Sequence, residues 1–234
     1  MDAKFDFSIL DKHAYFFEEK KEDIVNFIAH YKGSLSETIN NELRTKQFED
    51  LTRSHQLYVL YLDNLIREFP RTKHEIYLYR GLADIPFLSQ YFKNSTKNLS
   101  TLFKEAIGEC IMFKGFLSTT YSPAIACQFA NSYEDNIDIV LKIKIPSNFP
   151  ILAVDAALNV LNVFNREQAI YDEEDEILLP RNLMFRVISV RKEKCLNKDI
   201  YLITLDTSCS QIKPTGMPIL NNKDKKLLSK WFKL

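Results

Sequence analysis

The sequence predicts an α+β fold in which an N-terminal helical region precedes a core of mainly antiparallel β-sheet. Residues 15–69 are rich in Glu, Lys, Leu, Tyr and Phe and contain one Gly and no Pro, a composition that favours helices. From residue 71 onward the chain changes to short apolar or alternating runs that are typical of strands. These runs do not alternate regularly with helical segments, so a parallel sheet built from βαβ units is disfavoured.

Residues 1–70 form the predicted helical region. Ser34, followed by Glu37, has the pattern of a capping box and predicts that a helix begins there. Apolar residues recur at nearly helical spacing over residues 51–69, and the residue before a proline is disfavoured in a helix. We therefore expect the last of these helices to cover part of the core and to end before Pro70.

Residues 71–208 form the predicted core domain. Six runs within it have the length and the β-branched and aromatic content of strands: IYLYRGL, FKGFLSTT, IDIVLKIKI, EILLP, MFRVISVRK and DIYLITLD. Two helices are expected between them. One covers residues 123–131, with Ser122 as its cap and a proline in its first turn, and the other lies near 156–166, with Asp155 as its cap.

Residues 209–234 form a predicted basic amphipathic tail. A helix in this segment would place apolar and basic side chains on different faces, the apolar ones being Leu227, Leu228, Trp231 and Leu234 and the basic ones Lys223, Lys226, Lys230 and Lys233. Such a helix either docks on a membrane or a partner protein or packs against its own domain, and the sequence leaves both interpretations open.

The charge balance and the apolar segments disfavour some classes of protein. Lysine plus arginine and aspartate plus glutamate both number 31, so overall charge does not direct the chain to nucleic acid. The N-terminal residues lack the apolar run of a signal peptide, and no segment approaches the about 18 apolar residues that span a bilayer. We expect a protein that acts in the cytoplasm or is exported without a cleaved signal peptide.

The histidines and cysteines give no sign of a metal site. The four histidines lie in different segments, without the spacing of a zinc-binding helix. The four cysteines, Cys110, Cys127, Cys195 and Cys209, are far apart in the sequence and form no C-x-x-C pair. We expect free thiols in a reducing compartment and no metal cofactor.

The strongest local signal for chemistry is the acidic segment YDEEDE, which runs from Tyr171 directly into the apolar strand ILL. An isolated run of charges is usually a solvated loop. In a strand that begins near residue 174, however, Glu174 and Glu176 project to the same side and Asp175 points away. Two carboxylates that share a cleft raise each other's proton affinity, which is a common way to tune an acid/base pair.

Two further segments carry residues suited to an anionic ligand that contains a sugar. In YLYRG, the guanidinium of Arg80 can fork onto a phosphate, and Gly81 lets the backbone approach a ligand closely. In FLSTT, Ser118, Thr119 and Thr120 place consecutive hydroxyls where a strand gives way to a helix. Taken alone, the first segment also fits a surface arginine before a turn, and the second fits hydroxyls that bond to nearby backbone.

In this order, the three segments resemble the arginine–serine–glutamate (R-S-E) class of ADP-ribosyltransferases, which includes bacterial exoenzyme toxins and arginine-specific transferases. The motifs that carry the resemblance are YLYRG, FLSTT and ExEILLPR, with Ser118 38 residues after Arg80 and Glu176 58 residues after Ser118. The resemblance covers residues 75–207. It implies two packed, mainly antiparallel sheets that form an NAD cleft, and transfer of ADP-ribose from NAD, the co-substrate, to an arginine of a target protein.

The resemblance also implies a role for each motif residue. Arg80 contacts the NAD phosphates and the nicotinamide ribose, and the backbone of Gly81 holds the nicotinamide carboxamide. Ser118 braces the site beneath the catalytic glutamate, with Thr119 beside it among the NAD-binding residues. Glu176 bonds the ribose hydroxyl and favours departure of nicotinamide, because an anion near the ribose stabilises an oxocarbenium-like transition state.

Three more positions complete the expected site. Glu174 orients the acceptor and helps to deprotonate it; in the family an acid here accompanies arginine modification, and a glutamine accompanies asparagine modification. A carboxylate is needed because the arginine guanidinium, with a pKa above about 12, is a poor nucleophile. Tyr171 opens the loop that recognises the target protein. Phe129 lies near nicotinamide in a family-like fold, the alternative being packing in the core.

Two other functions stay open at this stage. An NAD glycohydrolase would transfer ADP-ribose to water, although Glu174 argues against hydrolysis as the main activity. A binding module would keep a vestigial cleft and dock on a membrane or a partner through the tail at 209–234. The transferase interpretation suits a bacterial toxin or effector that acts in the cytosol or at an organelle of a host cell, and equally an enzyme in the cytoplasm where it is made.

Overall fold

The computed structural model of the protein describes residues 8–10, 12, 22–82, 99–130, 138–156 and 175–207. The predicted features that lie outside these residues are Tyr171, Glu174, Cys209, nearly all of the helix near 156–166 and the tail at 209–234. The described residues combine helices with a mainly antiparallel sheet, so the predicted α+β class is confirmed.

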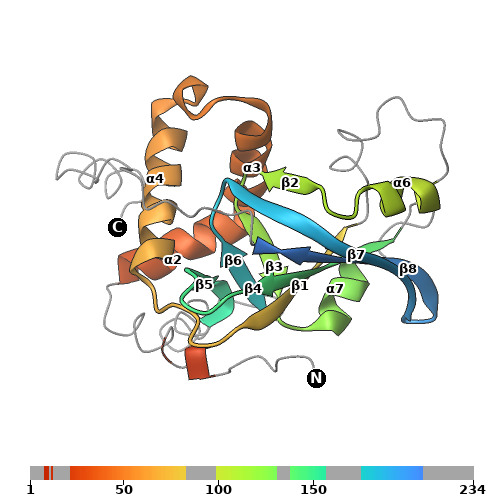
Figure 1. The fold of residues 1–234 in the computed structure, drawn as a ribbon. Coiled ribbons are helices and arrows are strands. Elements are labelled where there is room, and N and C mark those ends of the chain that lie inside the picture. Colours follow the sequence, from red (N-terminus) through yellow and green to blue (C-terminus); the bar gives the residue numbers. More distant parts are fainter. Residues whose placement is uncertain are drawn as a thin grey trace.

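The N-terminal part is helical, as predicted (Figure 1). Its main elements are, in chain order, α2 (Glu22–His30), the π-helical turn η1 (Tyr31–Leu35), α3 (Ser36–Thr45), the 3₁₀ turn η2 (Phe48–Asp50) and α4 (Arg53–Glu68). In Figure 1 these helices lie together at one side of the sheet, and α6 (Leu99–Glu105) lies at the opposite side.

The prediction that a helix begins at the capping box of Ser34 and Glu37 is wrong. Residues 22–45 form one continuous helical path in which η1 connects α2 to α3. At the junction, the backbone N–H of Ser36 donates to the carbonyl of Tyr31, so it already has a partner within the helix. The local signal failed because a capping box stabilises only a helix end whose N–H groups are unpaired.

Helix α4 follows the prediction. Thr52 caps it by accepting a hydrogen bond from the N–H of His55 at 3.3 Å, and the helix ends before Pro70. Its buried face packs on α2, where the ring of Tyr58 stacks on that of Phe27 with 4.2 Å between centroids. The Tyr58 hydroxyl also donates to the Phe27 carbonyl at 3.0 Å. These contacts bind α2 and α4 into one helical layer.

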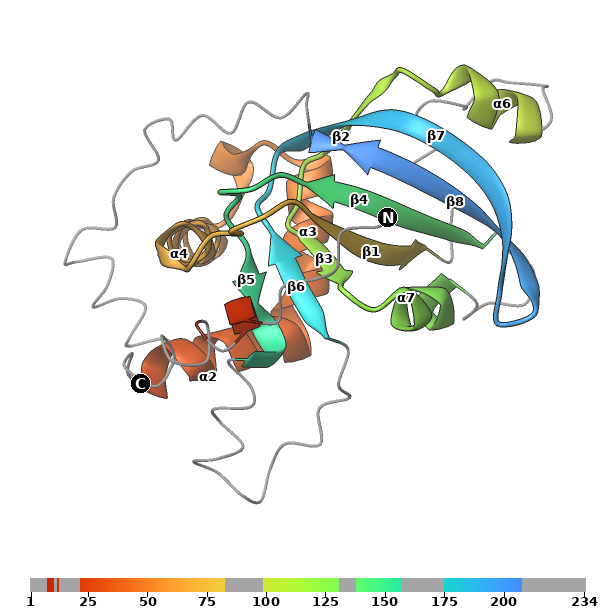
Figure 2. The same ribbon diagram turned by 60° about the horizontal axis from the view of Figure 1, so that its bottom comes forward.

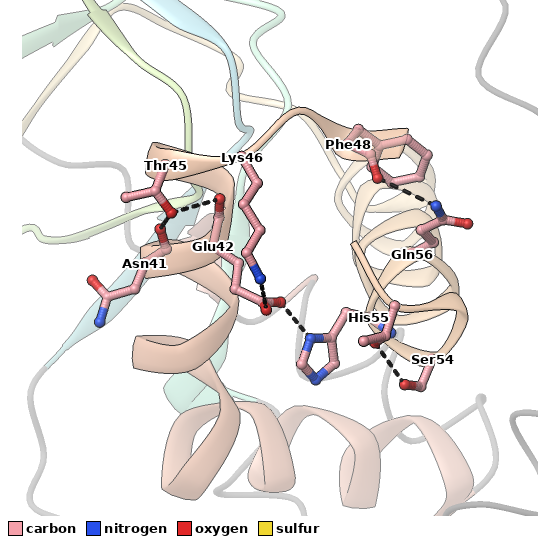
Figure 3. A network of polar contacts seen from close by, with 9 residues as sticks. Asn41, Glu42, Thr45, Lys46, Phe48, Ser54, His55 and Gln56 are labelled. Carbon is pink, nitrogen blue, oxygen red and sulfur yellow. Dashed lines mark hydrogen bonds and ion pairs between the residues drawn. The ribbon is translucent and has the colours of Figure 1, made fainter. Parts of the chain in front are cut away.

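A polar network joins α3 to the start of α4 (Figure 3). Glu42 of α3 accepts from Lys46, one turn along, at 2.7 Å, and it also pairs with the ring of His55 from α4. At the other side, the amide of Gln56 donates to the Phe48 carbonyl at 3.4 Å. The network fixes the place of α3, which carries part of the site described below.

The described strands form one eight-stranded sheet in the order β2-β7-β8-β4-β1-β3-β6-β5. In chain order they are β1 (Ile76–Leu82), β2 (Cys110–Phe113), β3 (Leu117–Thr120), β4 (Ile139–Ile145), β5 (Leu152–Ala153), β6 (Glu176–Leu179), β7 (Leu183–Cys195) and β8 (Lys198–Asp206). The neighbouring strands of this sheet are antiparallel except for β4 and β8. Five of the six predicted runs correspond to β1, β4, β6, β7 and β8. The sixth, FKGFLSTT, contains β3 but only the last residue of β2, and β5 lies in none of the predicted runs.

The sheet has two groups of strands that meet at a single residue pair. β1 and β3 are paired through Tyr79 and Thr120, whereas β1 pairs with β4 over its full length. Figure 2 shows β5 and β6 running across the direction of β4 and β8. The two predicted sheets are therefore recognisable as these two groups, but the one pair joins them into a continuous sheet that turns sharply.

Two hydrophobic clusters lie on the sheet. The larger one joins α2, α3 and α4 with strands of both groups. The smaller one lies beneath α7 (Pro123–Ala130) and consists of Ala126, Cys127, Ala130, Val140 and Ile200. The start of α7 follows the prediction, because the hydroxyl of Ser122 accepts from the N–H of Ile125 at 3.4 Å. In Figure 2, α7 lies directly beside β1.

The expectation of free thiols is wrong for two of the cysteines. Cys127 of α7 forms a disulfide with Cys195 at the end of β7. The two residues are 68 positions apart in the sequence, and the β7–β8 hairpin brings Cys195 to the helix. Cysteine spacing along the chain does not reveal this proximity, because it arises only when the sheet is formed.

Candidate active site

A cavity of about 330 Å³ lies where η1 and α3 face β1, β3 and β6. The lining residues are Tyr31, Lys32, Ser36, Glu37, Asn40 and Arg44 from the helical part, and Tyr79, Arg80, Gly81, Ser118, Thr119, Thr120, Phe129 and Glu176 from the core. The cavity thus brings together six of the residues that the sequence singled out: Arg80, Gly81, Ser118, Thr119, Phe129 and Glu176.

Arg80 is fixed by the backbone of a neighbouring strand. Its Nη1 donates to the carbonyl oxygen of Ser118 at 2.6 Å. Burial lowers the pKa of Arg80, and the nearby Arg44 adds to this effect, whereas Glu176 acts in the opposite direction. Because two guanidinium groups at one cavity repel each other, the cavity favours an anionic ligand that neutralises them.

The three consecutive hydroxyl residues of FLSTT have different surroundings. In the register of β3 and β6, Ser118 lies opposite Leu178, and Thr120 lies opposite Glu176. Thr119 donates to the backbone of β6 at 2.6 Å, and Thr120 accepts from the N–H two residues further on at 3.0 Å. Both threonine hydroxyls therefore bond to nearby backbone, which is the alternative role considered for this segment. Thr120 is also the cross-strand neighbour of Glu176.

Glu176 is the first residue of β6 and is only 8% exposed. Asp175, just before it, has a left-handed backbone with φ 52°, and its carboxylate accepts from the Tyr121 hydroxyl at 2.6 Å. The strand therefore begins at Glu176 and not near residue 174. Strand alternation does not continue across a left-handed residue, so it no longer implies that Glu174 and Glu176 share a face.

Two charged residues without any signal in the motifs contact Glu176. Asp155 accepts from the backbone N–H of Glu176 with Oδ2 at 2.7 Å and from Nζ of Lys32 with Oδ1 at 2.8 Å. The same Nζ lies 3.6 Å from Oε2 of Glu176. The predicted cap role of Asp155 is wrong, because residue 154 is already helical and both carboxylate oxygens have these other partners.

Gly81 allows α7 to lie close to β1. A Cβ at this position would be 2.0 Å from the carbonyl oxygen of Ala126 and 2.6 Å from the backbone nitrogen of Ala130. Phe129, on the same helix, lines the cavity and is 46% exposed. The alternative prediction, that Phe129 packs in the core, is therefore wrong. Its side chain lies at the cavity and is not part of the cluster beneath α7.

The helices also contribute Tyr31, Asn40 and Arg44 to the cavity, which the sequence analysis missed. Tyr31 is buried and accepts from Nδ2 of Asn40 at 3.1 Å, and burial raises the pKa of its hydroxyl. Within the described part of the chain, Oδ1 of Asn40 is buried without a hydrogen-bond partner. Arg44 donates from Nε to the Asn40 carbonyl at 3.1 Å. The i, i+4 spacing of Asn40 and Arg44 is visible in the sequence, but it becomes informative only once the helix faces Arg80.

The arginine that ends the third motif attaches the sheet to a helix. Nε of Arg181 donates to Oδ2 of Asp63 on α4 at 2.8 Å, and the two side chains are 9% and 4% exposed. The guanidinium also lies over the ring of Phe48, 5.0 Å from its centroid. Burial raises the pKa of Asp63, whereas Arg181 acts in the opposite direction. The pair holds the end of β6 against α4.

The described residues contain no group of His, Cys, Asp and Glu side chains arranged to hold a metal ion. In the same part of the chain, no helix is long and apolar enough to cross a membrane. The charged groups that line the cavity are the guanidinium groups of Arg80 and Arg44, the ammonium of Lys32, and the carboxylates of Glu37 and Glu176.

Comparison with known proteins places this chain among the ADP-ribosyltransferases, enzymes that use NAD as their substrate. A family model described as ADP-ribosyltransferase exoenzyme matches residues 12–210, so the chain belongs to this family. The resemblance to the R-S-E class inferred from the three motifs is confirmed. No curated protein matches the chain.

Solved structures of bacterial proteins have the same fold. Plx2a, an ADP-ribosyltransferase toxin from Paenibacillus larvae, is 16% identical with a TM-score of 0.65, over 88% of this chain and 98% of that chain. The C3 exoenzyme of Clostridium limosum is 16% identical with a TM-score of 0.65, over 88% and 97%. C3stau2 from S. aureus, solved with NAD, is 20% identical with a TM-score of 0.60, over 87% and 98%. Identities this low show a likeness of fold alone.

Proposed function

We propose that this chain transfers ADP-ribose from NAD to an arginine side chain of a target protein. The observation that carries the proposal is a buried carboxylate, Glu176, in one cavity with two guanidinium groups, Arg80 and Arg44. NAD carries a negatively charged diphosphate, and positive charge develops at its ribose during transfer. The cavity offers groups of opposite charge for both.

The two arginines are proposed to bind the diphosphate. Arginine has five N–H donors, and the bond from Arg80 to the Ser118 carbonyl uses one of them. An anion between Arg80 and Arg44 would relieve the repulsion that helps to lower the pKa of Arg80.

The nicotinamide end of NAD is proposed to lie at the part of the cavity that Gly81 of β1 and Phe129 of α7 line. The backbone of Gly81 would hold the carboxamide, and the exposed ring of Phe129 would lie against nicotinamide, with Thr119 nearby. Glu176 would accept from a ribose hydroxyl and stabilise the oxocarbenium-like transition state as nicotinamide leaves. Its burial strengthens this effect, because little water screens the charge.

The choice of arginine as acceptor is based on Glu174. A guanidinium has a pKa above about 12, so it must be aligned and deprotonated before it can attack the ribose. We propose that Glu174 does this and that Tyr171 begins the loop that contacts the target protein. Replacement of Glu174 should therefore affect the acceptor step more than the departure of nicotinamide.

We also propose that the chain acts as a bacterial toxin or effector. Plx2a and C3larvin, which have the same fold, are ADP-ribosyltransferases from Paenibacillus larvae described as toxins. We propose action in the host cytosol or at an organelle, the alternative being action in the cytoplasm of the producing cell. Binding to lipid vesicles with and without residues 209–234 tests whether the tail docks on a membrane.

The experiment that tests the activity is transfer of labelled ADP-ribose from NAD to the proteins of a cell lysate. The chain is compared with Glu176→Gln, Glu174→Gln and Glu193→Gln, the last being a control at an exposed carboxylate of β7. We expect labelled protein with the wild type and the control, and neither label nor released nicotinamide with Glu176→Gln. Glu174→Gln should still release nicotinamide but lose the label, and mass spectrometry should find the wild-type label on arginine.

Three other results would contradict parts of this proposal. Label on another type of residue would refute arginine as the acceptor. Release of nicotinamide by the wild type without any labelled protein would favour an NAD glycohydrolase. NAD left intact by the wild type would refute the transferase and favour a binding module with a vestigial cleft.

A further inference from the structure

We propose that Lys32 and Asp155 are positioning residues for Glu176. Together they fix the backbone of this glutamate, keep its side chain ionised and leave its charge available to the ribose of NAD. The inference rests on the proposed function, since it assigns both residues to the same reaction. Neither residue belongs to any of the three motifs.

Asp155 fixes the direction in which β6 begins. The chain turns through the left-handed Asp175 and enters the strand at Glu176. At this point Oδ2 of Asp155 accepts from the N–H of Glu176 at 2.7 Å. Because the direction of a strand determines where its side chains project, this bond also directs the Glu176 carboxylate.

Lys32 connects the two carboxylates. Its ammonium lies 2.8 Å from Oδ1 of Asp155 and 3.6 Å from Oε2 of Glu176. The side chains of Lys32, Asp155 and Glu176 are 12%, 19% and 9% exposed. Side chains that are this well shielded from water stay ionised when they are paired with an opposite charge. One ammonium between two carboxylates leaves one net negative charge, and that charge lies at the cavity.

The unequal distances indicate which carboxylate Lys32 binds directly. Lys32 lies closer to Asp155, so it pairs chiefly with Asp155 and does not bind the Glu176 carboxylate directly. At 3.6 Å the ammonium still favours the ionised form of Glu176 over the protonated form. A lysine bound directly to Glu176 would instead compete with the substrate.

Several other groups around Glu176 affect its ionisation. The charged and titratable groups near it are Lys32 and Tyr31 from η1, Glu37 and Arg44 from α3, Arg80 from β1, and Asp155 and Asp175 beside it. Arg80 and Lys32 favour the ionised carboxylate and the acids oppose it, whereas burial raises the pKa of the Tyr31 hydroxyl and keeps it neutral. Loss of Lys32 removes one of the nearest cations, so protonation should then inactivate the enzyme at a higher pH.

The test measures nicotinamide release from NAD by the full chain, with kcat and KM determined as functions of pH. The variants are Lys32→Met, Lys32→Arg, Asp155→Asn and the double variant Lys32→Met/Asp155→Asn. Lys144→Met is the matched control, because Lys144 also pairs with a carboxylate, that of Glu75, at 3.0 Å but does not line the cavity. Thermal unfolding of each variant reports its stability separately.

Lys32→Met is expected to lower kcat about tenfold, to leave KM within about twofold and to move the acid limb of kcat up by about one pH unit. Lys32→Arg keeps the positive charge and should restore most of the rate. Asp155→Asn should lower kcat more than Lys32→Met does, because the ammonium then moves onto Glu176. The double variant removes that competitor, so its rate should recover to the level of Lys32→Met alone.

A merely structural salt bridge predicts a different outcome. Lys32→Met and Asp155→Asn would then lower the melting temperature but leave kcat, KM and the pH profile as in the wild type. That result would overturn the positioning role, while NAD turnover by the wild type would still support the proposed function. No turnover by the wild type would overturn both. If Lys32→Met does not fold, the test relies on Lys32→Arg and Asp155→Asn. The inference expects a much higher kcat for Lys32→Arg than for Asp155→Asn, so equal kcat values for these two variants would refute it.

Discussion

Replacing Gly81 by alanine tests the close contact between β1 and α7. The added Cβ would lie 2.0 Å from the carbonyl oxygen of Ala126, 2.6 Å from the nitrogen of Ala130 and 2.8 Å from Cβ of Phe129. None of these atoms is the far end of a flexible side chain, so a change of rotamer cannot relieve the contacts. Since real Cβ atoms essentially never come closer than 3.0 Å to another heavy atom, α7 must withdraw by about 1 Å or more.

The cost of this change follows from the type of contact. Overpacking usually costs about 1–3 kcal/mol, and contacts with backbone atoms put Gly81→Ala at the upper end, about 3 kcal/mol. For a chain of about 150–250 residues, each kcal/mol lowers the melting temperature by about 2–4 °C, so we expect a fall of about 6–12 °C. Withdrawal of α7 also displaces Phe129 from the cavity, so the affinity for NAD should fall as well.

Thermal unfolding followed by circular dichroism measures the stability, and calorimetric titration with NAD measures the affinity. Gly33→Ala is the matched control for stability, because Gly33 lies in the helical turn η1 and nothing lies within 4 Å of an added Cβ. Alanine is favoured over glycine in helices, so this variant should be as stable as the wild type or more stable. Equal melting temperatures for Gly81→Ala and the wild type would refute the reasoning.

Three further changes test other contacts. Asp63→Ala leaves Arg181 buried without its partner and should lower the free energy of unfolding by about 3–5 kcal/mol, whereas apolar residues at both positions should restore most of it. Chemical denaturation measures the free energy of unfolding of the single and the double variant, and a value for Asp63→Ala equal to that of the wild type would contradict the expectation. Reduction of the disulfide between Cys127 and Cys195, separated by 68 residues, should remove about 4 kcal/mol; unfolding curves that are the same with and without reductant would show otherwise. The pKa of Glu42 lies below its ordinary value of 4.5, chiefly because of the hydrogen bond from the lysine one turn along. This stabilisation is present above pH 4.5 and is lost as the pH falls through the lowered pKa, so the difference in melting temperature between the wild type and Glu42→Gln should disappear in acid.

The strands and the long helix could be predicted because their determinants are local. In β4, the run IVLKIKI has the apolar and alternating residues of a strand with one well-buried face. In α4, the spacing of apolar residues marks the buried face, and Pro70 marks the end. The capping box at Ser34 failed because it is a local pattern whose effect depends on whether the preceding helix continues.

The site could be predicted only in part. Arg80, Ser118 and Glu176 come from three strands and meet at one cavity, as the order of the motifs implied. The roles of Lys32 and Asp155 at the site could not be predicted, because their contact joins residues 123 positions apart and no local pattern encodes such a pairing. The direction of Glu174 relative to Glu176 also could not be predicted, because Asp175 between them adopts a left-handed conformation. A glycine often marks such a position in a sequence, but aspartate also tolerates it.

The junction between the two groups of strands has a mechanical consequence. A long ladder of paired residues resists bending, so we expect the sheet to bend most easily at the junction, where only Tyr79 and Thr120 are paired. The hydrogen bond from Arg80 to Ser118 crosses the same junction. Arg80, which is proposed to bind the NAD phosphates, therefore also links the group of strands that contains β1 to the group that contains β6 and Glu176. Loss of activity in an Arg80 variant would combine a lost charge with a changed spacing, and Arg80→Lys, which keeps the charge but not the forked shape, separates the two effects.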